Sequence, residues 1–213
     1  MSKKKANTNK NRFITKAESF KYILELLIVA FGVFLGVLVS NWNSERKYQK
    51  SAEITVNLII HEIENNIGSL NSSIEYLEGL KHDFDSIKKT IPKSAMYSPY
   101  FETDVFKFSY MHSWRGPGLP LLENSVYESA KLSGVFQSLS IEKLQLISSC
   151  YSVQESYSKF AESILDRLYG LNSNTKTSDA IAIIEILTGD NLSTEKHIRE
   201  RLLSSVQEIQ ESR

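Results

Sequence analysis

An uninterrupted apolar run near the N-terminus is the strongest pattern in the chain. Residues 26–39 carry no charge, and eleven of these 14 positions are Leu, Ile, Val or Phe. With its flanks the run covers the 21 residues 22–42, which as an α-helix measure about 31 Å, the thickness of a bilayer's hydrocarbon core. Residues 22–42 are therefore predicted to form a transmembrane helix.

One carboxylate, Glu25, lies inside this predicted span. The large apolar side chains favour insertion by about 0.3–0.6 kcal/mol each, which sums to about 5 kcal/mol. A carboxylate costs about 3 kcal/mol at the bilayer centre and less near an interface. Insertion is therefore favoured. A core helix of a soluble protein is the poorer interpretation, because a basic leader precedes the run and Trp42 follows it.

The segment after the run, SNWNSERK, distinguishes an anchor from a cleavable signal peptide. It offers no small-x-small cleavage site, since Trp42 and the charged residues 45–47 stand there. We predict an uncleaved signal anchor. Seven Lys or Arg residues lie in the leader, residues 1–21, against three in residues 46–50. The positive-inside rule then places a disordered leader in the cytoplasm and residues 43–213 outside it.

The glutamate shares one helical stripe with two glycines. At 3.6 residues per turn, Glu25, Gly32 and Gly36 fall on one narrow face, with Ser40 at its edge. The spacing Gly-x-x-x-Gly lets two helix backbones approach closely in lipid. One interpretation is that this face packs against a partner helix. The other is that Glu25 extends to the cytoplasmic interface and the glycines have no special role. The sequence leaves both open.

Residues 43–213 show the periodicity of α-helices. Apolar positions between residues 56 and 77 alternate in steps of four and three and continue to Ile91, after which Pro92 ends the helix. No proline lies between residues 22 and 91, so span and seam can form one helix. The first seam consists of Val56, Ile60, Ile63, Ile67, Leu70, Ile74 and Leu77.

Three further helices are predicted toward the C-terminus. The second seam consists of Leu146, Cys150, Val153, Tyr157, Phe160, Ile164 and Leu171. Ser140 is the expected N-cap of that helix. A short apolar helix follows over residues 179–188 and ends at Gly189, and an amphipathic helix covers residues 194–212. The expected fold is all-α: one N-terminal transmembrane helix that continues into an antiparallel helical bundle with coiled-coil-like seams.

The connection over residues 93–120 is irregular and rich in aromatic residues and proline. Within it, DVFKFSYMHSW alternates with a period of two, which suits an extended edge, although a short helix fits almost as well. One interpretation is an aromatic flap that covers the open end of the bundle. The other is a ligand or partner surface formed by Tyr110, His112, Trp114 and Arg115.

Few residues of the chain indicate a chemical function. Lys plus Arg and Asp plus Glu each number 25, so the net charge of zero argues against binding to nucleic acid. His61 and Glu62 begin like the zinc motif HExxH, but position 65 is Asn, and the four histidines share no metal-type spacing. Cys150 lies on an apolar seam and is interpreted as a buried hydrophobe. Acidic residues are expected on exposed helical faces, and no metal, cofactor or enzymatic activity is predicted.

Two stretches of the chain resemble an uncharacterised bacterial family. The first joins a glutamate, six apolar residues and a glycine to N-W-N and an acidic–basic pair; its matching residues are Glu25, Gly32, Asn41, Trp42, Asn43, Glu45 and Arg46. The second is SVYESAKLSGVF, residues 125–136. The chain thus resembles small single-pass membrane proteins with an N-terminal anchor, found in Bacteroidetes-type genomes and classed as a domain of unknown function. Its leader is longer and richer in Asn than that family's pattern.

The resemblance implies an architecture and no reaction. With it, the predicted location is the bacterial inner (plasma) membrane, with the bulk of the chain in the periplasm. We expect a membrane-anchored interaction or accessory protein that contacts the lipid bilayer and assembles, as a homo-oligomer or with another membrane protein, through the Gly32 and Gly36 face and the helical seams. The alternative is an extracytoplasmic sensor that binds a ligand near Trp114 and signals through a membrane partner.

Overall fold

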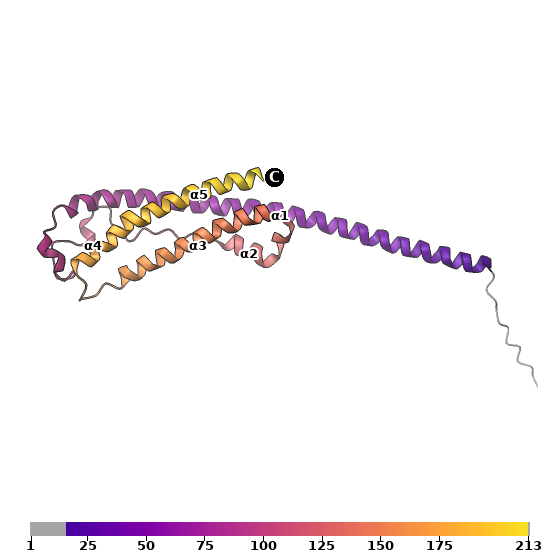
Figure 1. Cartoon of the computed structure of the whole chain (residues 1–213), viewed down its shortest axis with the longest axis horizontal. Coiled ribbons are helices and arrows are strands. Elements are labelled where there is room, and N and C mark those ends of the chain that lie inside the picture. Colours follow the sequence, from indigo (N-terminus) through magenta and orange to yellow (C-terminus); the bar gives the residue numbers. More distant parts are fainter. Residues whose placement is uncertain (1–15, 213) are drawn as a thin grey trace, which may run out of the picture. The chain divides into compact units, whose positions relative to one another are not determined.

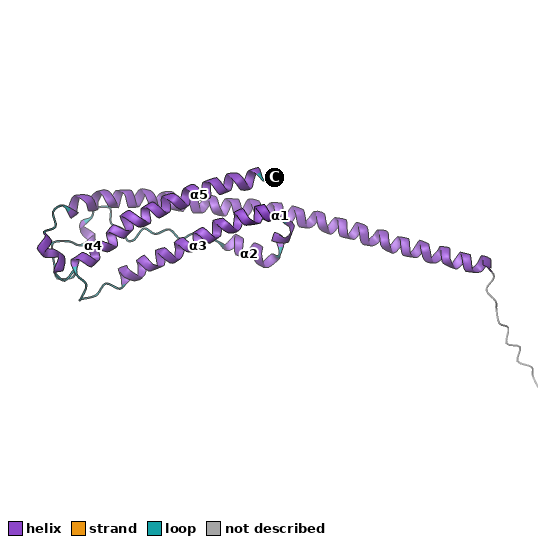
Figure 2. Ribbon diagram, viewed as in Figure 1, coloured by secondary structure: helices purple, strands orange, loops and turns teal. Residues whose placement is uncertain are grey.

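The structure, a computed structural model, describes residues 16–212 and confirms the all-α fold. Its helices are α1 (Lys16–Lys88), α2 (Ser125–Ser133), α3 (Ile141–Tyr169), α4 (Thr177–Glu185) and α5 (Leu192–Glu211). Three 3-10 helices cover Lys93–Tyr97 (η1), Phe108–Tyr110 (η2) and Val135–Ser138 (η3), and a π-helix covers Ile186–Asn191 (η4). The described residues contain no strand, only one isolated bridge between Pro99 and Lys176 (Figure 2).

The chain divides into two compact units, Met1–Lys50 and Ser51–Arg213. In the first unit the described residues belong to α1, and the large apolar side chains of residues 24–39 are exposed. Most of the predicted leader, residues 1–15, lies outside the described residues. Residues 16–21 are helical, so disorder was the wrong prediction for them, because extending an existing helix costs far less than starting one.

The bundle of the second unit is formed by α3, α5 and the part of α1 that belongs to it (Figure 1). Helix α5 runs antiparallel to α1. Lys196 at its start pairs with Glu78, and Arg199 one turn later reaches Asn71, which lies earlier in α1. The same helix is antiparallel to α3, as the predicted bundle requires.

Helices α1 and α3 instead run parallel to each other. Tyr151 bonds Glu62, and one turn further along both helices Gln154 bonds Asn66. This direction is possible because residues 113–124 return along α1 before α3 begins. We call residues 113–124 the return segment.

The first predicted seam is confirmed. All seven of its residues are buried, and Leu80 and Phe84 continue the line. Helix α1 ends at Lys88, three residues before the predicted end, since the residue preceding a proline is disfavoured in the helical conformation and the chain leaves the helix just before it. Ile91 is nevertheless buried beyond the helix end.

The second seam is rotated relative to the prediction. Val153 and Phe160 are only half-buried, and Leu171 lies beyond the end of α3. The buried face consists of Ile147, Cys150, Tyr151, Gln154, Tyr157, Ala161, Ile164 and Leu168. The prediction favoured the most apolar residues, whereas α3 turns Gln154 inward because Asn66 of α1 supplies a polar partner on that side.

The predicted helix end at Gly189 is wrong. The π-helix η4 joins α4 directly to α5, and Leu187, Thr188 and Asn191 within it are buried. A π-turn holds one residue more than an α-turn, which lets the buried faces of the two helices meet in register. Glycine inside a helix costs about 1 kcal/mol, which the packing of these side chains offsets. The last helix otherwise matches the prediction, with Ile198, Leu202, Val206 and Ile209 buried.

Residues 93–120 form the irregular connection that was predicted. Its aromatic part has no extended edge, and the short helix considered there is present only as the three-residue 3-10 helix η2. Phe106, Phe108 and Met111 are buried in a core shared with α1, α3 and α4. The rings of Phe84 and Phe106 meet edge to face with centroids 6.2 Å apart. The aromatic segment therefore serves packing, as the flap interpretation expects.

The return segment makes one prediction about stability. Gly118 has a φ of +71°, and a Cβ there would lie 2.2 Å from two ring atoms of Tyr76. Gly134 has a nearly identical φ of +73° but no neighbour closer than 3.9 Å. In thermal unfolding of the full chain, Gly118→Ala should cost about 1–3 kcal/mol more than Gly134→Ala, since only the first adds overpacking to strain. Equal losses would contradict the close packing of Tyr76 on Gly118.

Candidate functional site

The predicted membrane face lies on the exposed surface of α1. Glu25, Gly32, Gly36 and Ser40 are all exposed. A Cβ added to either glycine would meet no atom within 4 Å, so another helix backbone can approach closely there. Lys21 lies one turn before Glu25, with its Nζ 3.9 Å from Oε1. The lysine partner reduces the net charge at the N-terminal edge of the predicted span.

Two residues at the other edge of the apolar run also contact each other. The guanidinium carbon of Arg46 lies 3.9 Å from the centroid of the Trp42 ring, a cation–π contact. Tryptophan and arginine both favour the interface between lipid and water. Together with Lys21 and Glu25, this pair brackets a segment whose large side chains are apolar.

The structure does not gather the predicted aromatic surface into one pocket. Tyr110 and His112 are exposed. Trp114 is half-buried, and its ring lies 4.8 Å from that of Phe108, so it belongs to the packed core. Arg115 lines a surface hollow of about 530 Å³, which the other three predicted residues do not line. These four side chains therefore do not line one pocket, and a partner surface formed by them stays a prediction.

A polar stripe on α1 was missed by the sequence analysis. Its residues are Glu62, Asn66, Ser73, Tyr76 and Asp83, spaced by 4, 7, 3 and 7 along the helix. Each bonds the return segment or the start of α2, mostly through backbone groups. Such polar spacing beside an apolar seam was visible in the sequence, but its partners were not.

Asn66 and Asp83 illustrate how side chains of the polar stripe hydrogen-bond the backbone of the return segment. The Asn66 amide donates to the carbonyl of Glu123 at 2.8 Å and accepts from the amide of Glu123 at 2.8 Å, as a neighbouring strand would. Asp83 accepts from the backbone N–H of Ser113 at 2.6 Å. Hydrogen bonds from the Ser113 amide and hydroxyl hold the pKa of Asp83 below its ordinary value.

Glu62 caps α2 from outside that helix. Its side chain is buried, and Oε2 accepts from the backbone N–H of Val126 at 2.7 Å. Oε1 accepts from the phenol of Tyr151 at 2.6 Å, and the hydroxyl of Ser125 and the amide of Tyr127 complete the set. Burial, followed by the neighbouring carboxylate, raises the pKa of Tyr151. The positive end of the α2 dipole thus receives a carboxylate.

A second buried carboxylate, Glu195, lies in the first turn of α5. Its Oε1 accepts from the phenol of Tyr157 at 2.6 Å and from the amide of Asn191 at 2.8 Å. Oε2 has no hydrogen-bond partner among the described residues. Burial raises the pKa of Glu195, and the hydrogen bonds oppose this only in part. The expectation that acidic residues occupy exposed faces is therefore wrong for Glu62 and Glu195.

The remaining candidates for a chemical function are the cysteine and the histidine of the zinc-like motif. Cys150 is buried as predicted, and burial raises the pKa of its thiol. His61 is exposed, and its Nδ1 lies 3.1 Å from Oε2 of Glu64. Among residues 16–212, no group of three or more His, Cys, Asp or Glu side chains could hold a metal ion.

Comparison with known proteins adds no identity. No family model, curated protein or solved structure matches the chain.

The Glu62 cap predicts an asymmetric response to mutation. Glu62→Gln replaces one acceptor oxygen by an NH₂ group that faces donors, so it should destabilise the full chain by about 2–3 kcal/mol. Asn124→Ala, at the N-cap position of α2, should change stability by less than about 0.5 kcal/mol, since the Asn124 side chain makes no cap bond. Thermal melts that rank the two variants in the opposite order would contradict capping by Glu62.

Glu195 predicts a pH dependence of stability. Its folded-state pKa is raised above the ordinary value of 4.5, so the folded state holds this proton more tightly than the unfolded state does. The resulting stability is full below the ordinary pKa and is lost as pH rises through the raised one. Relative to Glu195→Gln, the wild-type melting temperature should therefore fall from pH 4.5 upward.

The matched control is Glu162→Gln, which changes an exposed glutamate on α3. Its melting temperature should follow the wild-type pH profile. A Glu195→Gln profile that also parallels the wild type would show that Glu195 ionises without cost in the folded protein.

Proposed function

We propose that the chain is a membrane-anchored helical interaction or accessory protein. The observation that carries this proposal is the exposed apolar part of α1. One helix among the described residues is long and apolar enough to cross a membrane; its most apolar window has a mean hydropathy of 2.2, and none of that window is buried by the rest of the chain. Exposed apolar surface of this extent is typical of a lipid or protein interface.

Lipid is the proposed surrounding of residues 22–42. The excess of basic residues before the run supports an N-terminus in the cytoplasm and the unit Ser51–Arg213 outside it. The Trp42 and Arg46 pair after the run supports an interface between lipid and water at that edge. In a bacterium this corresponds to a signal anchor in the inner membrane. The folded unit would then act at the outer surface of that membrane.

Assembly is proposed through the face that carries Gly32 and Gly36. Without side chains there, two helices gain van der Waals contact over their backbones, the main source of association in lipid. The Lys21 pairing of Glu25 lets the same face keep its carboxylate near the membrane edge. The proposed partner is a second copy of the chain or another membrane protein.

A competing face exists on the same helix. Leu27, Phe31 and Phe34 surround a shallow hollow at Ala30, on the side away from Gly32 and Gly36. Large residues fill lipid-facing surfaces well, whereas small residues favour close helix contact. The glycine face is therefore the better candidate, and Ala30 provides its control.

Cysteine crosslinking in native membranes tests the proposal. In a Cys150→Ala background, Val29→Cys places one thiol beside the glycine stripe. Gly32→Leu and Gly36→Leu should each lower the yield of the crosslinked product at least fivefold. That product is an oxidised dimer of the chain or a disulfide adduct with a different membrane protein. Ala30→Leu should leave the yield unchanged.

Two results would contradict assembly through this face. Crosslinking could be insensitive to both glycine substitutions, or Ala30→Leu could cause the same loss. The mass of the crosslinked species separates a second copy of the chain from a different membrane protein.

A further inference from the structure

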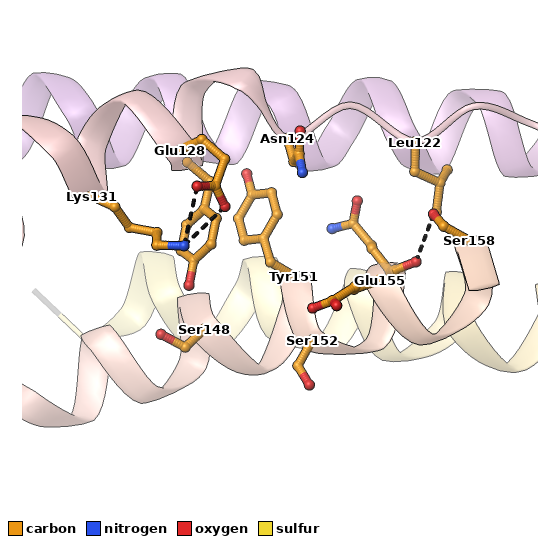
Figure 3. A pocket seen from close by; sticks show the side chains of 11 residues that line it. Leu122, Asn124, Glu128, Lys131, Ser148, Tyr151, Ser152, Glu155 and Ser158 are labelled. Carbon is orange, nitrogen blue, oxygen red and sulfur yellow. Dashed lines mark hydrogen bonds and ion pairs between the residues drawn. The ribbon is translucent and has the colours of Figure 1, made fainter.

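A polar cleft of about 500 Å³ lies between α3 on one side and α2 with the residues that lead into it on the other (Figure 3). Ser148, Ser152 and Glu155 line it from α3, and Asn124, Glu128 and Lys131 line it from the other side. Its volume is typical of sites for small molecules. None of the residues predicted as a ligand surface belongs to it, so it is separate from the aromatic connection.

One buried hydrogen-bond donor at this cleft lacks a partner. Gln154 lines the cleft, is 4% exposed, and has no bond to its Nε2 among the described residues. Its orientation is fixed by Asn66. Because Asn66 bonds both backbone groups of Glu123, its Nδ2 must face Gln154, whose Oε1 accepts at 2.6 Å. The Gln154 amide therefore cannot turn over to satisfy Nε2.

Other neutral polar side chains that line the cleft also make no hydrogen bond within the described residues. No side-chain hydrogen bond within residues 16–212 engages Asn124, Ser148 or Ser152, as the hydrogen bonds of this part of the chain show. The aromatic part of the wall is formed by Tyr127 and Tyr151, whose rings stack with centroids 4.1 Å apart and an angle of 8°. The cleft thus combines several neutral hydrogen-bonding groups with an aromatic surface.

The charges at the cleft are already paired. Lys131 contacts Glu128 at 3.0 Å, and Glu155 contacts Lys159 at 2.6 Å. The carboxylates of Glu128 and Glu155 outnumber the one lining cation, Lys131, which disfavours a phosphate or carboxylate ligand. A neutral ligand leaves both ion pairs in place.

We propose that this cleft binds a small neutral polyhydroxylated molecule, a mono- or disaccharide. Hydroxyl groups both donate and accept, which matches the amide of Asn124 and the serine hydroxyls, and a sugar oxygen can accept from Gln154 Nε2. A sugar oxygen that accepts from this buried donor adds a hydrogen bond to the complex. This inference goes beyond the proposed function and does not depend on the anchor.

Saturation-transfer NMR on the full chain in nanodiscs tests the inference, with glucose, maltose, trehalose and glucose 6-phosphate as probes. Nanodiscs avoid maltoside detergents, which would compete. At least one neutral sugar should bind, and glucose 6-phosphate should bind at least fivefold more weakly than glucose. Gln154→Leu should weaken binding at least tenfold.

Two matched variants make the result specific. Ser152→Trp blocks the mouth of the cleft and should abolish binding, whereas Ser163→Trp, at an exposed serine on the same helix, should not change it. Absence of binding to all three neutral sugars, tighter binding of the phosphate, or undiminished binding by Ser152→Trp would each overturn the inference. Gly36→Leu should bind sugar normally, so failure of the anchor's assembly is distinguishable from failure of this site.

Discussion

Backbone groups that leave water need partners, and in this protein α1 supplies them for a segment that has no secondary structure of its own. The return segment packs against α1 without a strand beside it, so its amides and carbonyls bond side chains of the polar stripe. Glu62 ends this arrangement by capping α2. The stripe thereby fixes where α2 begins, and with it the parallel direction of α3 and the position of the cleft.

The same helix meets two different requirements along its length. In the unit Ser51–Arg213 its apolar seam is covered by α3, α5 and the aromatic connection. In residues 26–39 no side chain is charged, and no part of the described chain covers the large apolar ones. A stripe one face wide suits a bundle, whereas apolar residues all round suit lipid. This contrast is the physical basis for proposing an anchor and a folded unit in one protein.

Periodicity predicted the helices well and their polar contacts poorly. The first seam needed only the spacing of its aliphatic residues, so it was found in full. Gln154 and Glu62 were missed as buried residues, because a buried polar side chain is stable only with partners that lie 88 and 89 residues away in sequence. The helix end predicted at Gly189 was wrong for a similar reason. Glycine often ends isolated helices, but the packing of the side chains around Gly189 in η4 outweighs that preference. The anchor face and the aromatic surface remain predictions, since the first needs a partner and the second is divided between core and solvent.

Extraction of membranes with alkaline carbonate tests most directly whether lipid surrounds the apolar segment. Carbonate strips peripheral proteins and leaves integral ones in the pellet. The full-length chain should stay with the membrane pellet, with its N-terminal segment intact by mass spectrometry. Release of the intact chain into the supernatant, or a mature form cleaved after Trp42, would contradict the account.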